Sequence, residues 1–295
     1  MLWKKKQKKE QVISHQTEKG ATRVVRTVPE MATLSYTDQG RRKYQQDAVF
    51  VSPSKKFAAN RKTRVLGIVC DGMGGMADGG KASRTAIEMM KTGFGKVQNM
   101  KELDIPAFFR QAIVTIDREI ASFPKENGRG SGTTMVAVIT EENKMYWASV
   151  GDSRIYIIRH GEMQQITRDH NYDMRLKEMV QKGQISQEEA DSQRQKEALI
   201  SFLGIGNVSL MDISVQPIEL QFGDIIMLCS DGITKTLPDK QIQGIILDDK
   251  KPIEQKAAQL VDAAVHGNTH SQDNTSVAIL QYRESVIKKE ESMHV

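Results

Sequence analysis

Five aspartates in this chain occupy similar positions at the ends of short apolar segments. Asp71 follows the apolar residues 65–70 and Asp231 follows 225–230, and a glycine comes directly after each. Asp47 and Asp273 come just before apolar segments, and Asp152 lies in a tight corner between two of them. Because hard cations prefer oxygen ligands, aspartates gathered at strand ends predict one metal site.

Carboxylates that converge repel one another, and no run of Lys or Arg is interleaved with these five. Bound divalent cations are the simplest compensation. Two such ions with a shared water supply a hydroxide nucleophile near neutral pH and stabilise a phosphoryl centre. Arg42, just before Asp47, is the candidate to hold phosphate oxygens bidentately.

The glycine-dense loop after Asp71 fits neither the phosphate-loop pattern nor GxGxxG. Since Gly72 has no Cβ, its carbonyl can approach a cation beside Asp71, although a plain turn with a capping aspartate is the alternative. No competing nucleophile motif is present. Cys70 and Cys229 lie in apolar segments typical of buried thiols, and the six histidines lack metal-ligand spacing.

Short β-rich segments and a few longer helical ones alternate from residue 31 to 281, without a linker or repeat, which indicates one domain. We expect strands at 49–51, 65–70, 134–140, 145–150, 154–159, 163–166, 211–215, 224–230 and 275–281. We expect helices at 82–96, 105–122, 172–182, 186–194, 239–247 and 252–266. Short connections between strands predict antiparallel sheets and a layered α+β fold, not a doubly wound one.

The net charge of +5 comes from one end of the chain. Residues 1–30 hold eight Lys or Arg and three Asp or Glu, whereas the remainder holds 34 of each kind. We expect a disordered basic tail, because such ends are more often solvated than bound to anionic lipid or nucleic acid. No apolar stretch follows it, so we expect neither a signal peptide nor a membrane span, and a cytoplasmic protein.

Taken in order, these motifs resemble those of the metal-dependent serine/threonine protein phosphatases of the PPM family, the 2C class, in its bacterial form. The similarity also includes Gly132-Thr133-Thr134 and Asp273-Asn274, and it predicts a phosphatase domain at 31–283 with a polar tail at 284–295. It implies a central antiparallel β-sandwich flanked by helix layers, with Mn²⁺ or Mg²⁺ at one end.

Matching the motifs by position implies a role for each ligand. Asp71 would bridge two tightly bound ions, and Gly72 with waters held near Asp47 would complete the site of one. Asp231 and Asp273 would complete the site of the other.

The resemblance assigns the remaining positions as well. Asp152 would hold a weaker third ion together with Asp231, and Arg42 would bind phosphate. Arg42, Asp71 and Asp231 would be the catalytic residues. The polar, helix-prone residues 168–204 would form a flap that faces the substrate.

The chain departs from the family pattern at four positions. Met73 stands where many members carry a histidine, so leaving-group protonation would fall to a water of the metal centre. Gln46, Met76 and Gly80 replace an acid, a histidine and a glutamate. All ligand carboxylates remain, which favours an active enzyme.

The resemblance implies phosphorylated protein substrates and a cognate serine/threonine kinase whose products the enzyme hydrolyses. We expect a monomer and no nucleic-acid partner. Two alternatives stay open: an inactive binding protein on the same fold, and a phosphatase of small molecules.

Overall fold

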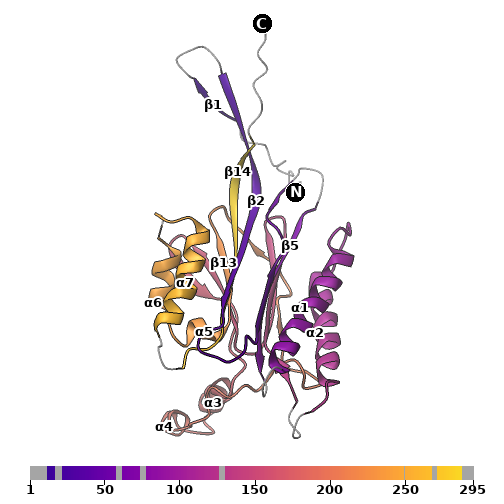
Figure 1. Cartoon of the computed structure of the whole chain (residues 1–295), viewed down its shortest axis with the longest axis vertical. Helices are drawn as coiled ribbons and strands as arrows, with labels where there is room; N and C mark the ends of the chain where they lie inside the picture. Colours follow the sequence, from indigo (N-terminus) through magenta and orange to yellow (C-terminus); the bar gives the residue numbers. More distant parts are fainter. Residues whose placement is uncertain are drawn as a thin grey trace.

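The segments predicted as strands pair into two antiparallel sheets in the computed structural model, which describes residues 12–16, 22–57, 62–73, 78–125, 130–248, 250–267 and 271–287 (Figure 1). The first sheet contains β1 (Val12–Gln16), β2 (Thr22–Asp38), β4 (Lys55–Lys56), β9 (Arg154–Arg159), β10 (Glu162–Gln165), β13 (Ile225–Cys229) and β14 (Thr275–Ile287). The second contains β3 (Asp47–Val51), β5 (Arg64–Met73), β6 (Gly132–Thr133), β7 (Met135–Glu141), β8 (Lys144–Val150), β11 (Asp212–Ile213) and β12 (Ile218–Glu219).

Two helices cover the outer face of each sheet (Figure 1). The helices α1 (Asp78–Val97) and α2 (Ile105–Ala121) pack on the second sheet, and α6 (Asp239–Ile246) and α7 (Ile253–Gly267) pack on the first. Helix α2 begins at an N-cap, because the Asp104 carboxylate accepts a hydrogen bond of 3.0 Å from the Ala107 N–H. Its apolar stripe then faces the sheet, as the helical spacing predicts.

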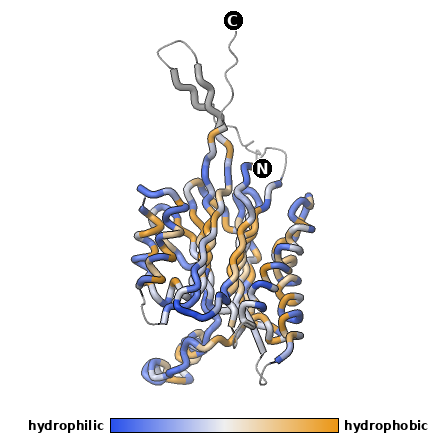
Figure 2. Tube along the Cα trace, in the orientation of Figure 1, coloured by the Kyte–Doolittle hydropathy of each residue, from blue (hydrophilic) through white to orange (hydrophobic). Residues whose placement is uncertain are grey.

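Three apolar cores hold these four layers together. Val136 and Leu228 belong to the core between the sheets, Ile68 packs under α1 and α2, and Met227 packs under α6 and α7. Figure 2 shows the apolar residues concentrated in the strands and on the helix sides that face them. The α+β sandwich with outer helix layers is therefore confirmed, and both cysteines are buried free thiols, as predicted.

At the two ends of the domain, β2 was not predicted as a strand, and β14 continues beyond its predicted end at residue 281. β2 begins at Thr22 and pairs with β14 as far as Ile287, so both strands cross the boundaries predicted at residues 31 and 283. The prediction of a disordered tail is wrong for residues 12–16 and 22–30, because their backbones pair as strands β1 and β2. Residues 1–11, 17–21 and 288–295 of the predicted tails lie outside the described residues.

Three further helices lie near one end of the sandwich (Figure 1). The short α5 (Asp231–Thr234) follows β13 directly, whereas α3 (Tyr172–Gln181) and α4 (Gln187–Asp191) belong to the predicted flap. None of the helices in the described ranges is both long and apolar enough to cross a bilayer.

Candidate active site

The antiparallel register brings the predicted aspartates to one end of the sandwich. In the second sheet, Asp47 at the start of β3 lies opposite Asp71 near the end of β5. In the first sheet, the end of β13 lies beside the start of β14, which places Asp231 near Asp273. Neighbouring antiparallel strands run in opposite directions, so the end of one always meets the start of the next.

An open cleft of about 390 Å³ lies at this end. Six of the predicted site residues line it, namely Arg42, Asp71, Gly72, Asp152, Asp231 and Asp273. Thr134 of the predicted Gly132-Thr133-Thr134 motif also lines it, as do three residues that the sequence did not single out, Glu197, Leu199 and Lys235. The structure thus joins residues from both sheets and from the flap in one site.

Asp47 does not line the cleft but lies buried behind it. Its side chain accepts a hydrogen bond of 2.7 Å from the Ser230 hydroxyl, and the Ser230 oxygen accepts one of 3.0 Å from the Ser276 N–H. The Oδ1 atom of Asp47 has no hydrogen-bond partner. Asp47 is therefore part of the charged cluster, held from below by a hydroxyl between the two sheets.

Burial and mutual repulsion make these carboxylates hard to ionise. Burial, and then the charges of Asp47 and Asp231, raise the pKa of Asp71 well above its usual range. Burial raises the pKa of Asp47 to about 7, and burial together with the Asp231 charge raises the pKa of Asp152 to about 7. Such a cluster favours additional positive charge in the cleft.

Two side-chain cations lie among the carboxylates: Arg42, which the sequence placed in the site, and Lys235, which it did not. Arg42 Nη2 lies 2.6 Å from Asp273 Oδ2, and Lys235 Nζ lies 2.5 Å from Asp231 Oδ2. In the described part of the chain, no three His, Cys, Asp or Glu side chains are close enough together to hold a metal ion as they stand. The acidic side chains thus share the cleft, but two of them point to these cations.

The residues fit divalent cations by their chemistry. Asp231, like Asp47, has a buried Oδ1 atom without a hydrogen-bond partner. Unpaired buried carboxylate oxygens are costly unless a cation or a donor compensates them. Oxygen ligands from Asp47, Asp71, Asp231 and Asp273 suit Mn²⁺ or Mg²⁺ better than softer metals.

The backbone beside the carboxylates is packed too tightly for side chains. A Cβ at Gly72 would lie 2.1 Å from the Gly79 carbonyl oxygen, and one at Gly232 would lie 2.0 Å from the Asn274 carbonyl oxygen. The Asn274 side chain in turn donates hydrogen bonds to the carbonyls of Gln39 and Tyr44, at 2.8 and 3.1 Å. Asn274 therefore holds the loop that carries Arg42. The nearby substitution Met76 lies outside the described residues.

The flap is fixed to the domain where it leaves the sheet. The buried His170 accepts a hydrogen bond of 3.2 Å from the Gly151 N–H at Nδ1, so Nε2 donates to Asp212, 3.1 Å away. Arg154 next to this corner forms a bidentate pair with Asp169. These bonds tie the start of the flap to the loop that carries Asp152.

A buried carboxylate fixes the other end of the flap. Asp117 on α2 is 1% exposed and accepts hydrogen bonds from the backbone N–H groups of Gly204, Gly206 and Val208, at 2.8, 3.0 and 3.0 Å. The sequence contained a signal that was missed, because an aspartate on the buried face of an amphipathic helix requires polar partners.

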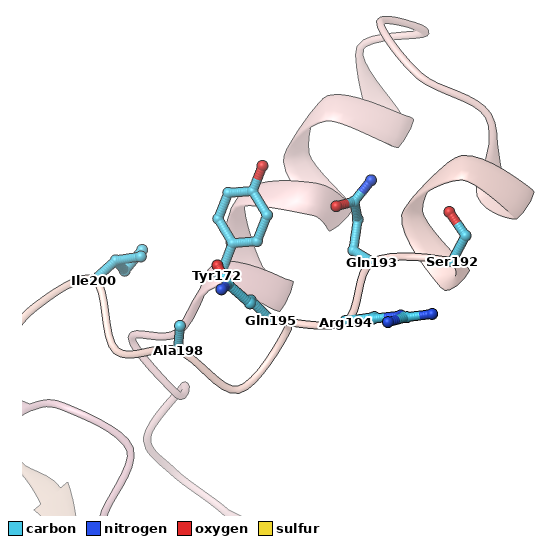
Figure 3. Close-up of a pocket in the computed structure, with 7 residues that line it drawn as sticks. All are labelled: Tyr172, Ser192, Gln193, Arg194, Gln195, Ala198 and Ile200. Atoms are coloured by element: carbon cyan, nitrogen blue, oxygen red, sulfur yellow. The ribbon is translucent and has the colours of Figure 1, made fainter.

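One extended segment of the flap lies between the cleft and a second hollow. Glu197 and Leu199 face the cleft, whereas Ala198 and Ile200 line a hollow of about 600 Å³ on the flap, together with Tyr172 (Figure 3). The segment is held by a hydrogen bond of 2.8 Å from the Tyr172 N–H to the Ala198 carbonyl.

Comparison with known proteins agrees with this geometry. The family model described as "Protein phosphatase 2C" matches residues 39–263. "Serine/threonine phosphatase stp" of Listeria monocytogenes is 30% identical over 225 residues, which cover 75% of this chain and 86% of that protein.

Solved structures of bacterial phosphatases share the fold. The S. agalactiae serine/threonine phosphatase is 30% identical, with a TM-score of 0.69, and the match covers 85% of this chain and 99% of that one. Another similar structure is the catalytic domain of the serine/threonine protein phosphatase PstP in complex with two manganese ions. It is 26% identical, with a TM-score of 0.66, and the match covers 86% of this chain and 99% of that one.

Proposed function

Because this chain belongs to the protein phosphatase 2C family, we propose that it hydrolyses phosphoserine and phosphothreonine in proteins and so reverses a serine/threonine protein kinase. The observation that carries the proposal is the cleft in which aspartates from both sheets lie around Arg42. A phosphate monoester is an anion and needs positive charge for binding. The carboxylates of the cleft would repel it unless cations offset their charge.

The cofactors are two Mn²⁺ or Mg²⁺ ions. Asp47, Asp71, Gly72, Asp231 and Asp273 would hold them, by the oxygen chemistry given above. When bound, such ions supply an activated water for attack on phosphorus and stabilise the charge of the transferred group. A weaker third ion at Asp152 and Asp231 would meet the Lys235 ammonium at Asp231 Oδ2.

The chain itself positions the phosphate. The Arg42 side chain is 58% exposed and uses one nitrogen for Asp273, so its other N–H donors are available to phosphate oxygens. No histidine lines the cleft among the described residues, so the leaving oxygen of serine or threonine takes its proton from water. Arg42, Asp71 and Asp231 are accordingly the residues on which turnover depends.

The proposal is tested with Asp71→Asn and Asp231→Asn in the full chain. Each variant removes one carboxylate charge from the cleft while keeping the side-chain size. We expect Mn²⁺-dependent hydrolysis of an aryl phosphate and of a phosphothreonine peptide to be lost in both. Asp262→Asn, an exposed change on α7, is the control and keeps wild-type turnover. Wild-type turnover by purified Asp71→Asn would refute the assignment.

The choice of substrate is tested separately. We propose phosphoproteins as substrates, because the flap forms a wall of the cleft and offers surface to residues that flank the phosphate. Higher kcat/KM on phosphopeptides than on phosphorylated metabolites is expected; the reverse order would indicate a small-molecule phosphatase. Binding of phosphopeptides without turnover would indicate an inactive binding protein. We further propose a monomer that acts in the cytoplasm, where a cognate kinase supplies its substrates.

A further inference from the structure

Lys235 lines the cleft but has no role in the proposed mechanism. It is the last residue of the turn that begins with Asp231, so its side chain returns to that aspartate, four residues earlier. Lys235 Nζ lies 2.5 Å from Asp231 Oδ2, which is the shorter of the two cation contacts in the cleft.

The same ammonium also acts on two other acids. The charge of Asp152, which is buried beside Asp231, acts on Lys235, and Glu197 Oε2 of the flap lies 4.0 Å from Nζ. Lysine side chains are protonated at neutral pH, and this ammonium is in direct contact with the Asp231 carboxylate. Lys235 therefore places a permanent positive charge among three acids from the sheet and the flap.

Arg42 is the counterpart on the opposite side, where it contacts Asp273. The positive charges are thus divided: one cation faces Asp273, and the other faces Asp152 and Asp231. A divalent ion that used the Oδ2 atom of Asp231 together with Asp152 would compete with the ammonium for that oxygen and would be repelled by its charge at close range.

We propose that Lys235 is a built-in cation for the Asp152 side of the cleft, so that a divalent ion binds there only by displacing the Lys235 ammonium from Asp231. Lys235 is then a positioning residue that lowers the affinity of this side for metal and confines tight binding to the side of Asp71 and Asp273. The inference rests on the proposed metal-dependent function.

The test measures metal binding directly, by equilibrium dialysis of the EDTA-stripped full chain against Mn²⁺ with the bound metal quantified. Lys235→Met removes the charge but keeps a long side chain, and Lys235→Arg keeps the charge. Lys240→Ala removes an exposed lysine of α6 and is the control. In Lys235→Met we expect the weakest Mn²⁺ site to bind on the order of tenfold tighter, as removal of a like charge near a divalent ion implies.

The variants separate the possible outcomes. Lys235→Arg and Lys240→Ala should give the wild-type binding curve. Equal binding curves for the wild type and Lys235→Met, or equally tight weakest sites in Lys235→Met and Lys240→Ala, would overturn the inference while leaving the phosphatase assignment intact. A wild-type chain that binds no Mn²⁺ and hydrolyses no phosphopeptide would instead overturn the proposed function, and the inference with it.

Discussion

Asp117 provides the sharpest test of how the flap is held. Both of its carboxylate oxygens accept hydrogen bonds from consecutive parts of the flap exit, Oδ1 from Gly204 and Gly206 and Oδ2 from Val208. The residue is buried on α2, so water does not replace these bonds in the folded state. Asp117→Ala removes both acceptor oxygens and so all three hydrogen bonds, and Asp117→Asn removes only the acceptor for Val208.

The size of the effect follows from those three contacts. A hydrogen bond to a charged group contributes about 1.5–3 kcal/mol, and a buried donor left without a partner costs about 1–3 kcal/mol. We therefore expect Asp117→Ala to lower the free energy of unfolding by about 3 kcal/mol or more, unless residues 204–208 detach locally first. For Asp117→Asn we expect a loss of about 1–3 kcal/mol, because its amide group would face the Val208 N–H.

Two measurements separate global from local loss. Urea denaturation gives the free energy of unfolding, and amide hydrogen exchange reports the protection of Gly204, Gly206 and Val208. Because the flap forms a wall of the cleft, Asp117→Ala should raise KM for a phosphopeptide more than KM for an aryl phosphate. Glu119→Ala, an exposed change on the same helix, is the control. Unchanged exchange at the three amides together with unchanged urea stability would refute the reasoning.

Two further predictions concern the cleft. The pKa values of Asp47 and Asp152 are raised to about 7 in the folded chain and lie near 4 in the unfolded chain. Between these values the folded chain binds more protons than the unfolded chain, so its stability decreases as the pH rises. We therefore expect the melting temperature in EDTA to fall between pH 5 and pH 7.5. Excess Mn²⁺ should remove most of this decrease, and a flat profile in EDTA would contradict the argument. Gly72→Ala should lower both the melting temperature and the Mn²⁺ affinity, because the Cβ of the alanine would meet the Gly79 carbonyl. Wild-type values for this variant in thermal scans and dialysis would count against this contact.

The parts of the fold that depend on burial were predictable from sequence. β5 and β13 are continuous apolar segments, and α2 shows its apolar stripe at helical spacing, so the four-layer arrangement follows. The extended pairing of β2 with β14 was not predictable, since β2 mixes charged and apolar residues without a clear alternation and its order comes from a partner far away in the sequence. Local patterns carry no information about such partners.

The candidate site was predictable in its acids and in Arg42, but not in Lys235. Aspartates at strand ends are visible in the sequence, whereas no helix was predicted directly after the strand at 224–230, so α5 and the role of Lys235 were missed. A single helical turn has too few residues to show a period. Once α5 is known, the spacing of Asp231 and Lys235 predicts their pairing directly.

The position of the site between the sheets gives metal binding a structural consequence. Ser230 follows β13 of the first sheet, yet its hydroxyl donates to Asp47 of the second, and it also accepts from Ser276 at the start of β14. Asp47 and Asp71 come from one sheet, and Asp231 and Asp273 come from the other. An ion held by both pairs crosslinks the two halves of the sandwich at this end. Because such an ion binds only the folded chain, it stabilises the association of the two sheets by mass action, in addition to any role in turnover.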